Sequence, residues 1–276
     1  MSFNEVIIKG GLGNQLFCLL HAYKILLSGE KVYLNLNNYS LSNRKDREFV
    51  LDKLFPKIFN VFEHSDSRTS YLRCIYAKFF EILFKDHRLG MLPAEKEFSI
   101  NYWPNCYIHT GYFQKINKSD LEKASLNLLL ANLKPYLKGL NSEFLAVHIR
   151  RGDYLFKKHS NHGLIAEKYI IEELQLQLSI ESFEGITIFT DSPELIDINM
   201  FKNLHNNVVF DKGGNSVEVF KRMLNHKGLV ASNSSFSLWA GILGDINRFS
   251  IPYFWMRGVK STTLGLDHIR RYNCVI

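Results

Sequence analysis

Residues 6–36, VIIKGGLGNQLFCLLHAYKILLSGEKVYLNL, contain the pattern that decides the fold. The β-branched run Val6–Ile8 predicts a short strand, the glycine block Gly10–Gln15 predicts a loop, and the apolar stretch Leu16–Leu27 predicts a helix. Lys31–Leu36 then alternates between outward and inward residues as a second strand does. Together these elements form a β-α-β unit, the building block of a parallel sheet covered by helices.

The second half of the chain alternates strands and helices in the same way. We expect strands at 144–147, 186–189, 208–210 and 229–231, and helices at 167–180 and 217–225. This order predicts a second parallel sheet, again covered on both faces. Gly139–Asn141 follows a helical pattern that ends near Leu137 and marks a linker. We therefore expect two domains, residues 1–140 and 141–276.

Composition and charge limit the kinds of protein that fit. A chain of 276 residues accommodates two compact domains at about 100–200 residues each. With 46% hydrophobic and 22% charged residues, the chain is neither disordered nor collagen-like. The net charge of +7 favours anionic partners: nucleic acid, phosphorylated ligands or an acidic membrane face.

The four cysteines form no C-x-x-C pair, which argues against a zinc knuckle or a redox dithiol and indicates reduced thiols. The first residues do not form a basic region followed by an apolar one, as a secretory signal does. No run reaches the ~20 apolar residues that a membrane-spanning helix needs. We expect a cytoplasmic protein, soluble or peripherally bound to a membrane.

Three segments carry residues suited to ligand chemistry, and the first is the glycine block. Glycines let a backbone approach a ligand closely, and the following helix N-terminus presents N–H groups to phosphate or sugar oxygens. The block has neither the G-x-G-x-x-G spacing nor the G-K-S/T ending of the two common nucleotide loops. A tight structural turn and a ligand loop explain it equally well.

The second segment, His148–Tyr154, follows the strand predicted at 144–147. In an open α/β sheet, ligands bind beyond the carboxyl ends of the strands. Alternation along the strand points His148 and Arg150 to one side and Arg151 to the other. Because arginine offers a planar, permanently charged fork, we predict that Arg150 binds a diphosphate and that Arg151 pairs with an acidic neighbour.

The third segment, Asn233–Gly241, also follows a predicted strand and opens a helix. A serine at a helix start caps backbone N–H groups, and the same geometry can hold a phosphate, so the two roles are compatible. Upstream, Glu218 lies on a predicted helix, where a carboxylate can accept two hydrogen bonds from guanine. Solvation is the more common role of an exposed helical glutamate.

Together these segments resemble the α-1,2-fucosyltransferases of glycosyltransferase family 11, which occur in bacterial surface-polysaccharide gene sets. The H-x-R-R-G-D motif is shared in part with α-1,6- and protein O-fucosyltransferases, so it indicates fucosyl transfer better than linkage. The glycine block and the Asn-Ser-Ser-Phe-Ser segment point to the α-1,2 group. The matching segments, in family order, are Gly10–Phe17, Gly111–Gln114, His148–Tyr154, Phe189–Asp191 and Asn233–Trp239.

The resemblance implies an α/β, GT-B-like fold in which two Rossmann-like domains face a cleft. Domain 1–140 would hold the acceptor, a galactose-terminated glycan that is lipid-linked or free, and domain 141–276 would hold GDP-β-L-fucose. Transfer to the 2-hydroxyl of galactose would invert the fucosyl centre. No cofactor, no divalent metal and no metal ligands are expected, and no two aspartates stand in D-x-D spacing.

Site residues carried over from the resemblance divide into two groups. Arg150, as the diphosphate ligand, and His148, as a nucleotide-side contact, form the catalytic group with Asp153. Asp153 is either the base that takes the acceptor proton or a carboxylate that locks Arg150 or Arg151, and the two roles are equally supported. The donor-binding group comprises Gly11, Gly13, Asn14, Arg150, Glu218, Asn233, Ser234 and Ser235.

Two other hypotheses remain at this stage. One is a fucosyltransferase of another linkage or acceptor. The other is a non-catalytic protein that binds nucleotides or nucleic acid, although zinc-ligand spacing and an RRM-type aromatic signature are both missing, so we expect no nucleic-acid partner. Ser70–Met91 has the pattern of a basic amphipathic helix. Packing within the domain is its favoured role, and contact with the anionic inner membrane is the alternative.

Overall fold

Contacts divide the chain into two compact units, Met1–Tyr136 (unit 1) and Leu137–Ile276 (unit 2). The linker predicted at Gly139–Asn141, on which the boundary at residue 140 depends, lies outside the described residues. The computed structural model describes residues 2–41, 48–65, 67–83, 98–103, 106–114, 116, 119–137, 142–155, 162–244, 246, 248–266 and 268–275.

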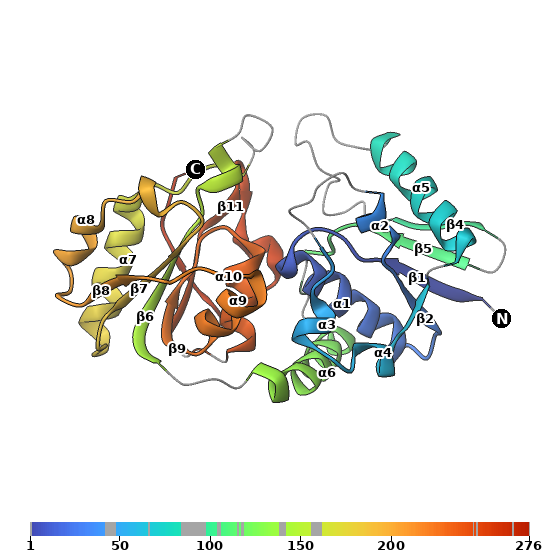
Figure 1. Cartoon of the computed structure of the whole chain (residues 1–276), viewed down its shortest axis with the longest axis horizontal. Helices are drawn as coiled ribbons and strands as arrows, with labels where there is room; N and C mark the ends of the chain where they lie inside the picture. Colours follow the sequence, from blue (N-terminus) through green and yellow to red (C-terminus); the bar gives the residue numbers. More distant parts are fainter. Residues whose placement is uncertain are drawn as a thin grey trace. The chain divides into compact units, whose positions relative to one another are not determined.

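Unit 1 contains a five-stranded sheet in the order β3-β2-β1-β5-β4, in which only β4 is antiparallel to its neighbour. Its strands are β1 (Phe3–Ile7), β2 (Val32–Asn35), β3 (Glu63–Ser65), β4 (Phe98–Trp103) and β5 (Cys106–Thr110). The chain adds β2 and β3 on one side of β1 and returns to place β5 on the other (Figure 1). The carboxyl ends of β1 and β5 therefore form a topological switch point.

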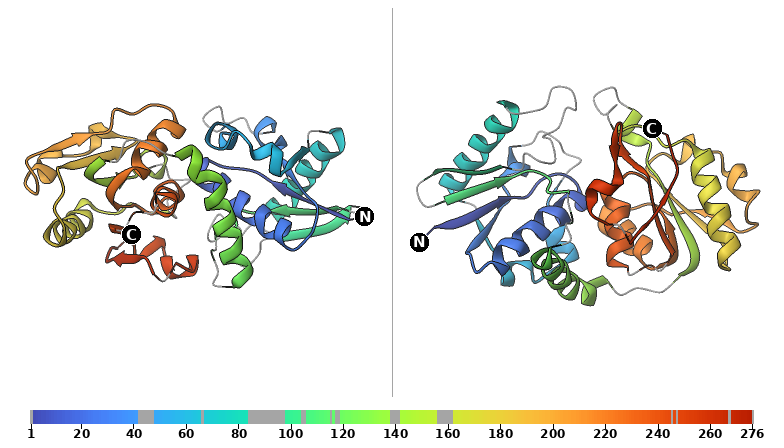
Figure 2. Two further views of the ribbon diagram at one scale, coloured as in Figure 1. Left: turned by 90° about the horizontal axis from the view of Figure 1, so that it is seen from below. Right: turned by 180° about the vertical axis from the view of Figure 1, so that it is seen from behind.

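Helices cover both faces of this sheet (Figures 1 and 2). They are α1 (Leu12–Leu27), α2 (Asn37–Ser40), α3 (Leu51–Leu54), α4 (Ile58–Val61), α5 (Arg68–Leu83) and α6 (Asp120–Leu137). α1 packs on β1 and β2, and α5 packs on β5 from the opposite face. α1 begins at Leu12, earlier than the predicted Leu16, because Gly11 is its N-cap and the first turn lies inside the glycine block.

α5 confirms part of the helix predicted at Ser70–Met91, and residues 84–91 lie outside the described residues. Its Arg73 turns into the core instead of toward solvent. Arg73 Nε lies 2.5 Å and Nη2 lies 3.0 Å from the two carboxylate oxygens of Glu5 on β1, which is fully buried. Ser70 Oγ donates a third hydrogen bond to Glu5, 2.9 Å long. This buried ion pair ties α5 to the central strand of the sheet.

The outer face of α5 carries large exposed apolar side chains. The group comprises Tyr71, Leu72, Ile75, Phe79 and Ile82. Their spacing places them along one side of the helix. Within the described part of the chain, every helix is too short or too polar to cross a membrane.

Unit 2 contains a six-stranded parallel sheet in the order β13-β10-β9-β6-β7-β8. Its strands are β6 (Ser142–Ile149), β7 (Ile186–Thr190), β8 (Val208–Phe210), β9 (His226–Val230), β10 (Arg248–Pro252) and β13 (Arg270–Tyr272), and β11 (Phe254–Met256) and β12 (Val259–Lys260) form a separate hairpin. The chain runs from β6 to β7 and β8, and β9 then pairs with the other side of β6. This reversal makes the carboxyl ends of β6 and β9 a second switch point.

Helices also cover both faces of the second sheet (Figure 1). They are α7 (Glu167–Ile180), α8 (Ile198–Lys202), α9 (Ser216–Leu224) and α10 (Ser235–Leu243), with short 3-10 turns η1 (Gly152–Leu155), η3 (Pro193–Leu195) and η4 (Ser261–Leu264). α7 and α8 pack on the face that carries Leu145 and Val147 of β6. α9 and α10 lie on the other face, where their Phe220 and Phe236 rings make an edge-to-face contact.

The predicted α/β fold class with two Rossmann-like domains is confirmed. The helix at 167–180 and the strands at 186–189 and 208–210 have the expected positions, whereas β9 begins at His226, earlier than predicted. All four cysteines lie in the described residues, are buried and form no disulfide, as the spacing indicated.

We predict that Arg73→Met destabilises the protein by about 3–5 kcal/mol, because it leaves the Glu5 carboxylate buried without its cation. The Glu5→Gln/Arg73→Met double variant should recover most of this loss, since it removes both charges. Urea denaturation measures both changes. Lys123→Met, which removes one partner of the exposed Lys123–Asp120 pair, is the control and should leave the midpoint nearly unchanged. An equally small effect of Arg73→Met would contradict the prediction.

Candidate active site

The switch point of unit 2 brings two of the predicted segments together. His148–Tyr154 begins at the end of β6, and Asn233–Gly241 follows the end of β9. His148 Nδ1 and Ser232 Oγ are hydrogen-bonded at 3.1 Å. The Tyr154 hydroxyl donates to the carbonyl oxygen of Asn233 at 3.0 Å. Segments separated by some eighty positions in the sequence thus share one edge of the sheet.

The carboxylate of Asp191 organises the arginine motif. Asp191 follows β7, which lies beside β6 in the sheet. Its Oδ2 lies 2.8 Å from Arg150 Nη1, and its Oδ1 accepts a 2.9 Å hydrogen bond from the backbone N–H of Arg151. A Cβ on Gly152 would lie 2.1 Å from Oδ2, so only glycine fits beside this carboxylate. Asp191 belongs to the Phe189–Asp191 segment of the family match, and no role was predicted for it.

The two arginines differ as predicted in their surroundings. Arg151 is buried and its Nη2 lies 2.5 Å from Glu167 Oε1, which confirms the expected acidic partner. The side chain of Arg150 remains 31% exposed, and its guanidinium lies 5.6 Å from the centre of the Tyr154 ring. Arg150 is therefore the arginine of this pair that a ligand at the carboxyl edge can reach.

His148 is a buried, neutral residue of this edge. Its side chain points to the α9 and α10 face, where its ring centre lies 6.0 Å from that of Phe236. Burial lowers the pKa of His148 to about 3, and the charge of Arg150 contributes to the shift. At neutral pH, His148 thus holds Ser232 through an uncharged imidazole. Proton transfer by this side chain near pH 7 does not fit that environment.

The start of α10 combines capping with a set of N–H groups at the same edge. Ser234 is the N-cap, and its Oγ accepts from the N–H of Phe236 at 3.3 Å. Ser235 is the first helical residue and is partly exposed. The Asn233 side chain is buried and donates to the carbonyl oxygens of His162 and Gly163. Asn233 and Ser234 thus shape the turn, and the first turn of α10 can receive an anion.

Glu218 lies in the first turn of α9, which follows β8 and begins at the same edge of the sheet. Asn215 caps this helix through the N–H groups of Val217 and Glu218. The Glu218 side chain is exposed and lies against Gly214, where a Cβ would come within 2.9 Å of Oε2. An exposed carboxylate at this edge is open to a ligand with N–H donors.

Asp153 lies in η1, immediately after the arginine pair. The structure describes its backbone, and its side chain lies outside the described part. Both sequence-based roles of Asp153, base and arginine lock, therefore stay predictions.

The glycine block, with Gly11, Gly13 and Asn14, lies in unit 1, whereas the other predicted site residues lie in unit 2. The Gln15 side chain donates to the carbonyl oxygens of Gly10 and Glu48, and so ties the end of the block to its start and to a neighbouring segment. Asn14 Oδ1 accepts from Gln114 at 2.7 Å. A Cβ on Gly11 would meet no heavy atom within 4 Å, so space is open beside it. The block combines a tight structural turn with an accessible backbone at Gly11.

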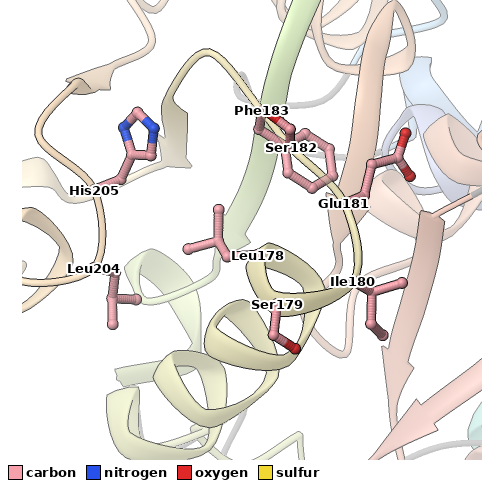
Figure 3. A pocket seen from close by; sticks show the side chains of 8 residues that line it. All are labelled: Leu178, Ser179, Ile180, Glu181, Ser182, Phe183, Leu204 and His205. Atoms are coloured by element: carbon pink, nitrogen blue, oxygen red, sulfur yellow. The ribbon is translucent and has the colours of Figure 1, made fainter.

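A hollow in unit 2 contains none of the predicted site residues (Figure 3). Leu178–Phe183, Leu204 and His205 line it. These residues lie between the end of α7 and the starts of β7 and β8, at the amino edge of the sheet. The hollow is therefore remote from the switch point, and the active-site assignment does not include it.

Comparison with known proteins identifies the family. The O-antigen biosynthesis glycosyltransferase WbnK of Escherichia coli is 23% identical over 301 residues, which cover 94% of this chain and 97% of WbnK. The structure of the E. coli heptosyltransferase WaaC with ADP aligns with a TM-score of 0.46 and 12% identity over 99% of this chain and 91% of WaaC. The profile of glycosyl transferase family 11 matches residues 48–251, a span that contains the Arg150 motif and the start of α10. The chain belongs to glycosyl transferase family 11.

Proposed function

We propose that the chain transfers L-fucose from GDP-β-L-fucose to the 2-hydroxyl of a terminal galactose, with inversion at the fucosyl centre. As a glycosyltransferase, it uses a nucleotide-sugar donor and a glycan acceptor. The observation that carries the proposal is the partly exposed Arg150 side chain, which Asp191 holds at the switch point that also carries the start of α10. This arrangement suits the diphosphate of a nucleotide sugar.

Departure of GDP leaves two negative phosphates that must be stabilised as the fucosyl–oxygen bond breaks. The Arg150 fork can donate two hydrogen bonds to phosphate oxygens and carries a permanent charge. The N–H groups of the first α10 turn add the positive end of a helix dipole. Because these groups are prepositioned where charge develops, we propose that the reaction needs no divalent metal.

Nucleotide selectivity and proton transfer complete the proposed mechanism. Glu218, exposed at the start of α9, would accept hydrogen bonds from the N1–H and 2-amino group of guanine. We propose Asp153 as the base that takes the acceptor proton, on its position directly after the arginine pair. In the alternative role, the Asp153 carboxylate would instead pair with Arg150 or Arg151 and hold it in place.

The acceptor proposal draws on two similarities. WbnK takes part in O-antigen biosynthesis, which supports a surface-polysaccharide acceptor for this chain. The glycine block and the start of α10 resemble the α-1,2 group, which supports the 2-hydroxyl of galactose. A fucosyltransferase of another linkage is the alternative. Family membership counts against the non-catalytic nucleotide-binding hypothesis.

Arg150→Ala should lower kcat/KM for GDP-fucose by about 100- to 1,000-fold, the range observed when one prepositioned donor is removed. Arg150→Lys should lie between this variant and the wild type, because lysine keeps the charge but loses the fork. Release of GDP in the presence of a galactoside and EDTA measures both. Arg248→Ala is the control, because Arg248 forms a similar ion pair with Glu181 at the amino edge. Unchanged turnover in Arg150→Ala would rule out the diphosphate role.

His148 should make stability depend on pH. Unfolded chains take up this proton near pH 6.5, whereas the folded pKa is about 3. His148 therefore contributes stability above pH 6.5 that is lost as the pH falls toward 3. The difference in unfolding free energy between wild type and His148→Asn should fall by about 2 kcal/mol from pH 7.5 to 5. If NMR showed the folded His148 ring titrating near pH 6.5, the neutral assignment would be wrong.

We also propose peripheral contact between α5 and an anionic membrane, on its exposed apolar residues and the net charge of +7. Sedimentation with anionic vesicles at low salt should retain the wild type and retain Phe79→Ser/Ile82→Ser less. Leu195→Ser, which alters an exposed apolar residue of unit 2, is the control. Wild-type protein that stays in the supernatant would exclude the contact.

A further inference from the structure

The switch point of unit 1 carries a polar cluster that the donor-binding proposal does not use. Lys9 follows β1, and Thr110 ends β5, so the two residues come from the strands between which the sheet order reverses. Glu81, from the last turns of α5, completes the cluster over this edge. Figure 1 shows α5 along one face of β1 and β5. Parallel sheets bind ligands at such positions.

The three side chains meet at a single carboxylate oxygen. Lys9 Nζ and Thr110 Oγ1 both donate to Glu81 Oε1, and Lys9 Nζ lies 3.3 Å from Thr110 Oγ1. Lys9 and Thr110 are buried, whereas the Glu81 side chain is 25% exposed. Within the described part of the chain, the hydrogen bonds to this carboxylate go to Oε1. Oε2 accepts from none of the described residues.

A second lysine–carboxylate–hydroxyl group in unit 1 differs from this cluster in how its carboxylate oxygens are used. Lys24 Nζ lies 2.7 Å from Glu122 Oε1, and Ser119 Oγ donates to Oε2 at 2.8 Å. Both oxygens of Glu122 are therefore used in a structural clip between α1 and α6. This group lies near the end of α1, away from the carboxyl edge. Of these two groups of described residues, the one at the switch point has a carboxylate oxygen to which neither the lysine nor the hydroxyl donates.

The backbone after Thr110 is shaped to present an aromatic ring. Gly111 has φ +153° and Phe113 has φ +50°, a value that non-glycine residues rarely adopt. Between them, the Tyr112 ring lies 5.1 Å from Lys9 Nζ and within 3.1 Å of the position that a Cβ on Gly10 would take. Backbone strain of this kind collects at functional sites. The Tyr112 ring thus lies between Lys9, which pairs with Glu81, and Gly10 of the glycine block.

The charge balance of the cluster selects the ligand class. The Lys9 cation is offset by Glu81, so the site has no net charge to attract a phosphate. An available carboxylate oxygen favours O–H donors and repels anions. A half-buried tyrosine ring supplies an apolar face against which the C–H groups of a pyranose can pack. Carboxylate and ring together suit a neutral, polyhydroxylated sugar.

We propose that Glu81, positioned by Lys9 and Thr110, binds a hydroxyl group of the acceptor sugar at the switch point of unit 1. The inference rests on the proposed glycosyl transfer and extends it to named acceptor-side residues. It applies whichever hydroxyl is the nucleophile. Lys9 and Thr110 act through Glu81 and are positioning residues.

Binding of methyl β-D-galactopyranoside to the full-length protein tests the inference, with GDP binding measured in parallel. Glu81→Gln should raise the galactoside Kd about tenfold or more, because it replaces a charged acceptor by a weaker neutral one. Its Kd for GDP should stay within about twofold of wild type, since residues of unit 2 bind GDP. Glu122→Gln is the matched control and should leave both constants unchanged.

Glu81→Gln leaves the buried Lys9 without its carboxylate and could therefore impair folding. A second variant separates such a folding defect from a loss of binding. Lys9→Met/Glu81→Gln removes both charges and should show the same weakened galactoside binding with a normal thermal transition. Wild-type affinity for the galactoside in both variants would overturn the inference, as would a wild-type chain that binds GDP but no galactoside. Failure of the wild type to bind GDP or turn over GDP-fucose would instead count against the proposed function.

Discussion

The carboxylate of Asp191 is the contact on which the candidate active site depends. It accepts the Arg151 backbone N–H and pairs with the Arg150 guanidinium, and so fixes the chain as it leaves β6. This close approach requires glycine at position 152, because any Cβ would overlap the carboxylate. Arg151 is directed to Glu167, so Arg150 is the one of the two arginines that a ligand can reach. One acidic side chain directly after β7 thus leaves one arginine of a basic motif accessible, and there we propose that a diphosphate binds.

Each unit reverses its strand order once, and chemically active residues collect at both reversals. At β6 and β9, a cation and the start of α10 offer positive potential, as a departing nucleotide requires. At β1 and β5, Lys9 and Glu81 offset each other and present an oxygen acceptor, which would suit the neutral sugar that we propose. The net charge of +7 therefore describes the chain as a whole and not each site. We propose that donor and acceptor selectivity follow from this local charge balance.

Local patterns allowed prediction of the parallel strands, the glycine block and the arginine motif, because strand periodicity and turn chemistry are encoded by neighbouring residues. Asp191 was missed because its role comes from a partner forty positions away. Arg73 is one of the basic residues of the predicted amphipathic helix, and its inward position is explained by the buried Glu5, which is distant in the sequence. Strands β10 (RFSIP) and β13 (RRY) were not predicted, because charged and polar residues interrupt their apolar pattern. Asn233 was predicted to bind the donor, but its side-chain amide donates to the carbonyl oxygen of His162 in a neighbouring loop.

A structure of the protein with GDP bound tests the central claim most directly, because it locates the diphosphate. We expect phosphate oxygens about 2.7–3.2 Å from the Arg150 guanidinium and from N–H groups in the first turn of α10, with Asp191 still paired to Arg150. A diphosphate bound elsewhere in the chain, with Arg150 and α10 making no contact to it, would contradict the assignment.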